Sequence, residues 1–571
     1  MNDSIQFLPP EVVNLIAAGE VIDSFAAVVR ELVENSLDAG ATRITVSIFP
    51  QLWRVQVADN GKGISLTNMQ KCAQAHSTSK IHHREDLVKI ATLGFRGEAL
   101  HSMAQLSRLE ILSRTAEEVG WRVVYDTEGK AGIPEAVAIA PGTIVTVADL
   151  FGNLPVRRKG LPSFAVQLKA VQNAIWQIAL CHPQVTWQVR QDDKVWFSIS
   201  PGASAKDVLP QVLRRVQVTD LVSHRLLVTS NQSSVTSYKL PVDNHESTIE
   251  FVVGLPDRCH RRRPDWVRVA VNGRWVHITE LEQAILAAFA RTLPRDRYPV
   301  CFIHLRIDPS QIDWNRHPAK TEIYLHNIDS WREKISQGIE EALRISPANL
   351  PGTAYHERVG KLLKVSAKKS DYTLNQDSPE PEINKTASDL ALMELRAVAQ
   401  VRNTYIVAEY PDGLWLVEQH IAHERILYEK LLDAWQIVPL ETPIILQELL
   451  PKQLEQLEFL GIEIEAFGNK MWAARSAPEM LHNRDDCAAA LLELSLGEDL
   501  QTAQVATACR SAIRNGTPLS LSEMQRLLDD WKSTRNPRTC PHGRPIYLPL
   551  AETALARFFR RHWVIGKSHG I

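Results

Sequence analysis

The sequence predicts a multidomain α/β protein. The chain has 571 residues, which is too long for a single hydrophobic core. Apolar residues at helical spacing alternate with strand-like runs in both halves of the chain. A stretch rich in Pro, Ser and charge, without apolar periodicity, separates these halves. We therefore expect domains at residues 1–205, 206–340 and 389–571, with a flexible linker at 341–388.

The composition is that of a globular protein without a strong overall charge. Apolar residues make up 44% and charged residues 23% of the chain, and the formal net charge is −2, so binding to DNA would need local basic patches. Seven cysteines scattered over a long chain indicate reduced thiols in the cytosol. A signal-peptide pattern and a membrane-spanning apolar run are both lacking, so we expect a cytoplasmic protein without a membrane partner.

The helix with the most chemistry has the sequence SFAAVVRELVENSLDAG, in which Asp23 or Ser24 can cap the start and Gly40 can end it. Its apolar residues recur at helical spacing on one side. Glu31, Asn35 and Asp38, spaced four and three apart, share another side. There the amide can bind Mg²⁺ while a carboxylate orients water, although such a polar stripe is more often solvated surface.

Two strand-like runs follow, at 42–49 and 52–58, and the second leads into Asp59-Asn60-Gly61-Lys62-Gly63. In the first run, Ile44, Val46 and Ile48 alternate with polar residues, which predicts that they face a core. The Asp59 carboxylate can accept a hydrogen bond from an exocyclic amine such as that of adenine. Gly61 and Gly63 let backbone approach a flat ligand. By itself, the pattern Asp-x-Gly-x-Gly is more often only a turn.

A glycine-rich segment, Gly94-Phe95-Arg96-Gly97-Glu98, precedes an apolar helical run at 99–106. Free N–H groups at a helix start, with glycines beside them, form an anion site. The sequence contains no Gly-x4-Gly-Lys-Ser/Thr, which excludes a P-loop ATPase.

Six segments, in order, resemble the motifs of the MutL family, the mismatch-repair branch of the gyrase, histidine-kinase and MutL (GHKL) ATPases. They are IAAGEVI (16–22), RELVENSLDAGA (30–41), ADNGKGI (58–64), HSTSKI (76–81), LGFRGEAL (93–100) and DLFGNLPVRRK (149–159). Six motifs in register are a specific signal, whereas any single one is weak. The resemblance implies an N-terminal GHKL (Bergerat) α/β sandwich, a second α/β domain of the ribosomal-protein-like type, and a C-terminal α/β dimerisation domain.

The same resemblance implies roles in an ATP site. Glu31 would be the general base for the attacking water, Asn35 would bind Mg²⁺, and Asp59 would recognise adenine. The other implied ATP and Mg²⁺ contacts are Asp38, Gly61, Gly63, Thr78, Gly94, Arg96 and Gly97. The family's pattern is altered at 23–25 and at positions 152 and 154, where no group with a chemical role is removed.

From 206 to 340 the pattern is mixed α/β, with strands expected at 249–255, 266–271 and 300–307 and a helix at 280–292. The segment from Ile312 to Glu322 resembles the family's phosphate-reaching segment, which implies that Lys320 contacts the γ-phosphate. Trp314 and Arg316 are larger than is usual there.

A basic run includes Arg261, Arg262 and Arg263. It predicts either sequence-independent contacts with DNA phosphates or a solvated loop.

The C-terminal region contains residue types that bind Zn²⁺ or Mn²⁺. Three of them lie on one predicted helix, two of these four apart and the third two residues earlier. Another lies in a later helical run, and the last two lie two apart in a loop. They are His420, Glu424, Glu418, Cys509, Cys540 and His542. Only the fold can bring them together, and their spacing does not show that it does.

These segments, with Phe559-Arg560-Arg561 as the last, resemble the endonuclease type of MutL C-terminal domain, which implies a metal-dependent nicking site. Two departures fall in the helix motif: Glu418 replaces the family's aspartate and Ile421 its alanine. Two interpretations therefore stay open, namely active nicking or a retained metal site without it.

The resemblance further implies a nucleoid-associated homodimer that binds double-stranded DNA and couples mismatch recognition by MutS to strand incision. The segment with Gln447, Leu449, Leu450 and Pro451 resembles a sliding-clamp-binding peptide shortened by one residue, or it is a loop internal to the domain. One alternative function is an ATP-driven matchmaker without nuclease activity. Another is a gyrase-like topoisomerase ATPase subunit, which would not explain the segments around His420 and His542.

Overall fold

The computed structural model describes residues 10–81, 83, 86, 90, 92–94, 97–228, 247–314, 323–344, 394–468 and 470–558. Its contacts divide the chain into two compact units. The first consists of Met1–Val252, Val267–Ala284 and Cys301–Ile335, and the second of Val253–Trp266, Ile285–Val300 and Ser336–Ile571. Arg96, Lys320, Phe559–Arg561 and the expected linker from residue 345 onward lie outside the described residues.

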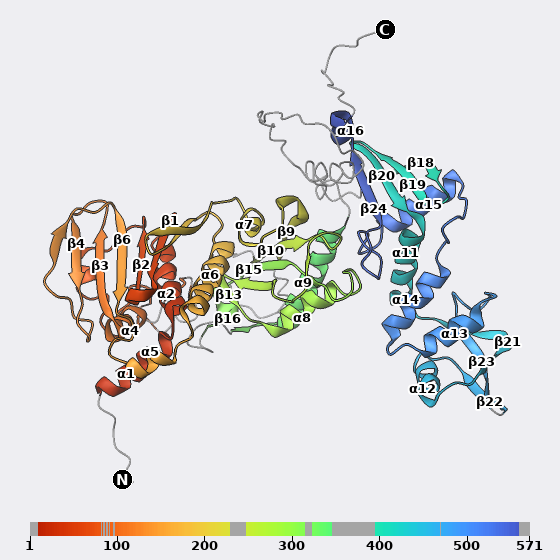
Figure 1. Ribbon diagram of the computed structural model, residues 1–571, viewed down its shortest axis with the longest axis horizontal. Coiled ribbons are helices and arrows are strands. Elements are labelled where there is room, and N and C mark those ends of the chain that lie inside the picture. The colour runs from red at the N-terminus through yellow and green to blue at the C-terminus, as the bar shows by residue number, and fades with distance from the viewer. Residues whose placement is uncertain are drawn as a thin grey trace, which may run out of the picture. The chain divides into compact units, whose positions relative to one another are not determined.

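An eight-stranded sheet with the order β5-β4-β3-β6-β2-β1-β7-β8 organises the first part of the chain (Figure 1). β1 and β7 run parallel, and the other neighbours pair antiparallel. Ile44, Val46 and Ile48 of β1 are fully buried, as their alternation predicted. The strands are β1 (Arg43–Phe49), β2 (Arg54–Asp59), β3 (Arg108–Arg114), β4 (Gly120–Val124), β5 (Glu135–Val137), β6 (Gly142–Ala148), β7 (Thr186–Gln191) and β8 (Lys194–Ile199).

Helix α2 (Phe25–Asp38) packs beside α6 (Phe164–Cys181) against this sheet (Figure 1). The Ser24 side chain accepts the N–H of Ala27 and caps α2, as predicted. The apolar side of α2, including Phe25 and Leu32, is buried. The other helices of this part are α1 (Pro10–Val21), η1 (Pro50–Leu52), α3 (Leu66–Met69), α4 (Ala99–Leu106), α5 (Pro155–Gly160), α7 (Ala205–Val212) and η3 (Val218–Asp220).

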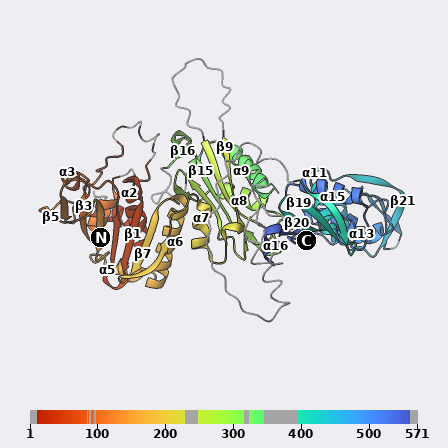
Figure 2. The ribbon, with the colours of Figure 1, turned by 90° about the horizontal axis from the view of Figure 1, so that it is seen from above.

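A five-stranded sheet with the order β13-β12-β15-β10-β9 follows in the chain (Figure 2). Its strands are β9 (Leu221–Val228), β10 (Ser247–Gly254), β12 (Val267–Val271), β13 (Arg274–Val276) and β15 (Cys301–Arg306). Two short pairs join β11 (His260–Arg261) to β14 (Tyr298–Pro299) and β16 (Ile312–Asp313) to β17 (Tyr324–Leu325). The helices are α8 (Thr279–Ala288), η4 (Pro309–Gln311) and α9 (Ile328–Leu343).

The helix expected at 280–292 ends earlier than predicted. α8 stops at Ala288, because the N–H groups of Ala290 and Thr292 bond to carbonyls three residues back instead of four. Arg291 then adopts a φ of +55°, which takes the chain out of the helical region. Apolar periodicity alone does not reveal such a turn.

Two further sheets form the C-terminal part of the chain. One has the order β18-β19-β20-β24 and the other β21-β23-β22. Their strands are β18 (Arg396–Val401), β19 (Tyr405–Tyr410), β20 (Gly413–Glu418), β21 (Ile437–Gln447), β22 (Ile464–Gly468), β23 (Met471–Pro478) and β24 (Tyr547–Ala551). The helices are α11 (Gln419–Asp433), α12 (Pro451–Phe459), α13 (Cys487–Ser495), α14 (Leu500–Ser511), α15 (Leu521–Lys532) and α16 (Glu552–Phe558).

One core joins α11 and α15 to the first of these sheets. Trp415 of β20 and Trp531 of α15 are fully buried in it, with ring centroids 6.2 Å apart, and Ala422 and Ile426 contribute from α11. Because this core fixes the face that α11 turns inward, it also fixes where the polar residues of α11 lie. None of the described helices is both long and apolar enough to cross a membrane.

His304 of β15 makes part of the fold sensitive to acid. Its side chain is buried, its Nε2 accepts the N–H of Gly273 at 2.9 Å, and burial lowers its pKa to about 3, helped by the nearby charges of Arg306 and His182. The unfolded histidine has a pKa of about 6.5, so below that pH the unfolded chain binds a proton that the folded chain does not. The free energy of unfolding then falls by up to about 1.4 kcal/mol per pH unit through this residue.

We expect the melting temperature of the wild type to fall more steeply between about pH 6.5 and 4.5 than that of His304→Gln, which keeps an acceptor but does not titrate. Thermal denaturation at several pH values measures this. The matched control is His277→Gln, at an exposed histidine of the same part of the fold. Equal slopes for wild type and His304→Gln would contradict the assignment.

Candidate functional site

Helix α2 presents the predicted catalytic face. Glu31, Asn35 and Asp38 lie along one side because they are spaced four and three residues apart. The Glu31 side chain is 12% exposed, and its Oε1 lies 4.0 Å from Nε of Arg30. Because the apolar side of α2 is buried against the sheet, the orientation of this polar side is fixed as well.

Lys80 connects this face to the segment that follows α3. Its ammonium lies 3.0 Å from Oδ1 of Asn35 and 2.5 Å from Oδ2 of Asp38. The Asp38 carboxylate also accepts the N–H of Leu93 at 2.9 Å and that of Gly94 at 3.0 Å. Asp38 thus ties α2 to both glycine-rich and lysine-bearing segments. No role was predicted for Lys80, although its place at the end of the HSTSK motif is the signal that marks it.

Asp59 lies at the end of β2, as predicted, with both oxygens hydrogen-bonded. Ser36 donates its hydroxyl to Oδ2 at 2.8 Å and Gly61 its N–H to Oδ1 at 2.9 Å. Burial raises the pKa of Asp59, and the hydrogen bonds from Gly61, Ser36 and Thr143 oppose that shift. A carboxylate has lone pairs beyond these, so Asp59 can still accept a further donor.

The two glycines beside Asp59 are required by the protein's own packing. A Cβ on Gly61 would lie 2.8 Å from that of Ala39. Gly63 has a φ of +74°, and a Cβ there would lie 2.1 Å from the carbonyl oxygen of Arg114. We expected these glycines to make room for a ligand. The structure adds a second reason for them, close backbone packing, which does not depend on a ligand.

The remaining ATP-site predictions fall on the neighbouring loops. Thr78 accepts the N–H of Lys80 with its hydroxyl at 3.2 Å. A Cβ on Gly94 would lie 2.8 Å from Nζ of Lys80, and Gly97 has a φ of +65°. Arg96 and Lys320 lie outside the described residues, so their roles stay predictions.

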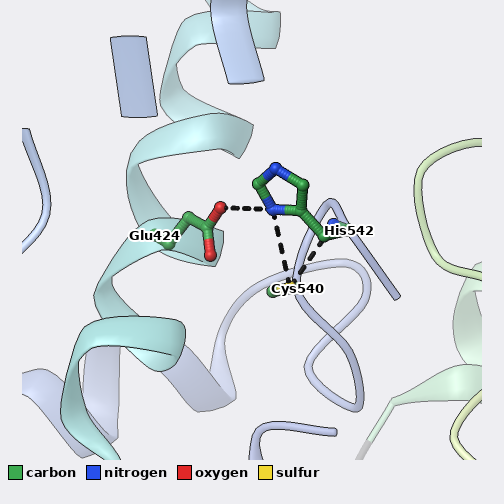
Figure 3. A group of neighbouring side chains, drawn as sticks. All are labelled: Glu424, Cys540 and His542. Carbon is green, nitrogen blue, oxygen red and sulfur yellow. Dashed lines mark hydrogen bonds and ion pairs between the residues drawn. The ribbon is translucent and has the colours of Figure 1, made fainter. Parts of the chain in front are cut away.

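Three predicted metal ligands converge in the C-terminal part. Glu424 lies on α11, whereas Cys540 and His542 lie on the loop before β24 (Figure 3). Nδ1 of His542 is 2.8 Å from Oε1 of Glu424 and 3.9 Å from Sγ of Cys540. Their candidate ligand atoms all lie within 4.8 Å of one another. Glu424 and Cys540 are fully buried, while 47% of the His542 side chain is exposed. A carboxylate, a thiol and an imidazole at this separation fit Zn²⁺.

The electrostatics of this group favour its charged forms. Contacts with Cys540 and then Glu424 raise the pKa of His542 to about 9. Burial by itself would raise the pKa of Glu424, but the proximity of His542 and Arg544 outweighs it and lowers that pKa. The pKa of Cys540 is also lowered, because contacts with His542 and Arg544 outweigh burial. A depressed thiol pKa increases the fraction of thiolate, which is the form that binds metals.

Arg544 belongs to this group, although the sequence analysis did not single it out. Its Nη2 lies 3.0 Å from Oε2 of Glu424, and its Nε donates to Sγ of Cys540 at 3.4 Å. Its signal in the sequence is its place in CPHGRP, two residues after His542.

The other three predicted ligands are arranged differently. Nε2 of His420 lies 4.0 Å from Sγ of Cys509, and its Nδ1 lies 2.9 Å from the carbonyl oxygen of Ile513. The Glu418 carboxylate accepts the N–H of Ile421 and caps the start of α11. Of the six, the structure thus brings three into one group, pairs His420 with Cys509 near enough to that group to interact with Glu424 electrostatically, and uses Glu418 at the helix end.

The predicted DNA and clamp contacts are placed but not tested. Arg261 forms a bidentate ion pair with Asp265, with atoms 2.8 Å and 3.1 Å apart, whereas Arg262 and Arg263 are exposed. In the clamp-like segment, Gln447 ends β21, the exposed Leu450 is the N-cap of α12, and Pro451 is its first residue. Leu449 packs partly against the core beneath the three-stranded sheet.

Comparison with protein families divides the chain in the same order. Residues 23–130 match the family described as "Histidine kinase-, DNA gyrase B-, and HSP90-like ATPase". Residues 228–344 match "DNA mismatch repair protein, C-terminal domain", and residues 398–519 match "MutL C terminal dimerisation domain". The chain therefore carries an ATPase domain and a dimerisation domain, and the predicted fold class is confirmed.

Two solved structures resemble the chain. "Crystal Structure of N terminal domain of a DNA repair protein" is 25% identical, covers 57% of this chain and 96% of its own, and has a TM-score of 0.48. "Aquifex aeolicus MutL ATPase domain complexed with ADP" is 24% identical, covers 50% and 92%, and has a TM-score of 0.35.

Full-length relatives extend the comparison to the whole chain. Proteins named DNA mismatch repair protein MutL from a Nostoc species and from Rippkaea orientalis are each 61% identical over 100% of both chains. The protein of that name from Caldanaerobacter subterraneus is 31% identical over 98% of this chain and 100% of its own. Identity at this level and coverage, together with the three family matches in order, shows that the chain belongs to the DNA mismatch repair MutL family.

Proposed function

We propose that this chain acts in DNA mismatch repair as a homodimer that binds and hydrolyses ATP, and that this cycle couples mismatch recognition by MutS to incision of double-stranded DNA. The observation that carries the proposal is the polar face of α2. Within an ATPase domain, Glu31, Asn35 and Asp38 share that face, and Lys80 and Gly94 contact it. The match to a dimerisation domain supports the homodimer.

The donors on α2 fit Mg²⁺. The Asn35 amide oxygen and a carboxylate oxygen of Asp38 both lie against the Lys80 ammonium, so this position already stabilises a cation. Amide and carboxylate oxygens are ligands that Mg²⁺ takes in proteins. Asn35 and Asp38 would hold the ion, and when bound it would neutralise charge on the ATP phosphates.

The chain's own residues then divide the remaining tasks. Glu31 accepts the proton of the attacking water as general base. Asp59 accepts a hydrogen bond from the adenine amino group. Thr78, Arg96 and Gly97 contribute to the lid over the phosphates. Lys320 contacts the γ-phosphate as a mobile positive charge.

A second activity, metal-dependent nicking of DNA, is favoured by the group of Glu424, Cys540 and His542. Sulfur and nitrogen donors from one loop and an oxygen donor from α11, with Glu424 and Cys540 fully buried, fit Zn²⁺ better than Mg²⁺. These residues would hold Zn²⁺ or Mn²⁺, and a bound metal would activate a water for attack on a phosphodiester. The matchmaker without nuclease activity is the alternative that the experiment below distinguishes. DNA contacts at Arg262 and Arg263, and binding of a sliding clamp at Leu450, complete the proposed partners.

Glu31→Gln and Asp59→Asn are expected to impair different steps. Glu31→Gln removes the base but keeps the shape, so kcat for ATP hydrolysis falls by about 10²–10⁴ while ADP affinity is retained. Asp59→Asn places a donor towards the donor group of adenine, so nucleotide binding itself is lost. Phosphate release and titration with a fluorescent ADP analogue measure the two effects.

The matched control is Glu128→Gln, an exposed residue of the same domain, which should leave both measurements unchanged. Wild-type hydrolysis by Glu31→Gln would contradict the assignment of the base.

Nicking of supercoiled plasmid with Mn²⁺ tests the second activity. We expect open circles from the wild type and none from Glu424→Ala or His542→Ala, because each loses a metal ligand. His482→Ala, at a half-buried histidine whose Nδ1 contacts the carbonyl oxygen of Glu479, is the control. A wild type that hydrolyses ATP normally but leaves the plasmid intact would contradict the nuclease and support the matchmaker.

The cap at Glu418 predicts a stability effect. Glu418→Ala removes the acceptor for the N–H of Ile421, so the free energy of unfolding should fall by about 1 kcal/mol, while bound Zn²⁺ stays at the wild-type level. Glu418→Asp should recover most of the stability, since aspartate is a strong capping residue. Denaturant unfolding and metal analysis measure these. Loss of zinc from Glu418→Ala would instead indicate that Glu418 is a ligand.

A further inference from the structure

A buried arginine joins the catalytic helix to the five-stranded sheet. Arg274, the first residue of β13, is 7% exposed. Its Nη2 lies 2.8 Å from Oε2 of Glu34, which is 6% exposed, and it also donates to the carbonyl oxygen of Leu93. Glu34 immediately precedes Asn35 on α2. Arg274, Glu34 and Leu93 are not among the residues assigned to the ATP site.

Each contact of Arg274 leads to a different part of that site. Through Glu34 it contacts the helix that carries Glu31 and Asn35. Through the Leu93 carbonyl it contacts the Leu93–Gly94 peptide, whose N–H binds Asp38 at 3.0 Å. The centre of the Trp314 ring lies 5.2 Å from its guanidinium carbon, and Trp314 belongs to the Ile312–Glu322 segment of the sequence that also contains Lys320.

The turn before Arg274 is itself held rigidly. Gly273, with a φ of +81°, accepts a hydrogen bond from Nε2 of His182 at 2.9 Å and donates its N–H to Nε2 of His304 at 2.9 Å. The Asn272 side chain bonds both to the carbonyl oxygen and to the N–H of Ile307, at 2.8 Å and 2.9 Å. These hydrogen bonds fix the backbone at Arg274, so the sheet determines where its guanidinium lies.

A buried ion pair is a weak source of stability, because desolvation offsets most of the attraction between the charges. Its effect on geometry is larger, since a planar guanidinium with several donors fixes the direction of each partner. Displacing a catalytic group by about 1 Å can lower a rate about a hundredfold. The pair is thus suited to setting position more than to adding stability.

We propose that Arg274 is a positioning residue for ATP hydrolysis, which sets Glu31, Asn35 and the Leu93–Gly94 segment relative to the five-stranded sheet. Its guanidinium is directed at Glu34 and at the Leu93 carbonyl, so it would act on hydrolysis through these partners and not by binding ATP itself. The hydrolysis rate therefore depends on the placement of that sheet, while adenine recognition at Asp59 does not. This inference rests on the proposed ATPase function and adds to it a residue outside the ATPase motifs.

The test removes both charges together, because a single substitution leaves an uncompensated buried charge and can prevent folding. Glu34→Gln/Arg274→Gln keeps two groups that can bond to each other without fixing the Leu93 carbonyl. The matched control is Glu110→Gln/Arg122→Gln, which removes an ion pair with atoms 2.6 Å apart on β3 and β4 of the same unit. Full-length proteins are compared by kcat and KM for ATP and by ADP affinity.

We expect kcat of the Glu34→Gln/Arg274→Gln variant to fall at least about tenfold, with KM and ADP affinity within about twofold of wild type. Arg274→Lys should recover part of kcat, because it keeps the charge opposite Glu34 but lacks the fork of donors. The control pair should change none of the three values. A purely structural pair would lower the melting temperature and leave kcat unchanged, and that result would overturn the proposal.

If circular dichroism shows that the Glu34→Gln/Arg274→Gln variant does not fold, the Arg274→Lys variant tests the proposal instead. A lowered kcat with ADP affinity retained supports the proposal, and a wild-type kcat overturns it. Failure of the underlying ATPase function is distinguishable, because the wild type would then show no hydrolysis, or Glu31→Gln would be as active as the wild type.

Discussion

The burial of α2 against the eight-stranded sheet is the constraint on which the N-terminal chemistry depends. Phe25 and Leu32 anchor the apolar side of the helix, and Ser24 fixes where it starts. Once that side is buried, a helix of 3.6 residues per turn must turn Glu31 and Asp38 the other way. The site is then assembled by bringing Lys80 and the Leu93–Gly94 peptide onto a helix that is already oriented.

The C-terminal group obeys the same rule with a different element. The core around Trp415 and Trp531 orients α11, and this places Glu424 inside, fully buried. A buried carboxylate needs compensation, which His542 and Arg544 supply from a single loop. The loop is thus held on α11 by charge, and this contact brings Cys540 beside Glu424. Glu424 and Cys540 are thereby favoured as the anions that bind metals, whereas a bound metal would have to displace the proton of His542, because histidine binds metals as the neutral imidazole.

Sequence reasoning succeeded where the physical cause is local. The capping of α2 by Ser24 and the buried alternation of β1 follow from neighbouring residues, and both were predicted. It failed at the end of α8, where a turn of i→i−3 bonds and the positive φ of Arg291 leave no mark on apolar periodicity. It also gave no role to Lys80 and Arg274, since even a basic residue within a motif has many possible partners and only the fold selects one.

The sequence by itself determined the α/β class, the faces of the main helices and the membership of the chain in its family, because periodicity, caps and motif order are properties of the chain read in one dimension. The tertiary structure alone decided which polar groups meet. It brought Glu424, Cys540 and His542 together, and it placed Glu418 at a helix cap. It also paired Glu34 with Arg274 inside the protein. The physical reason is that such contacts join distant segments, and the packing of apolar cores, not the spacing of the polar residues, sets their distances.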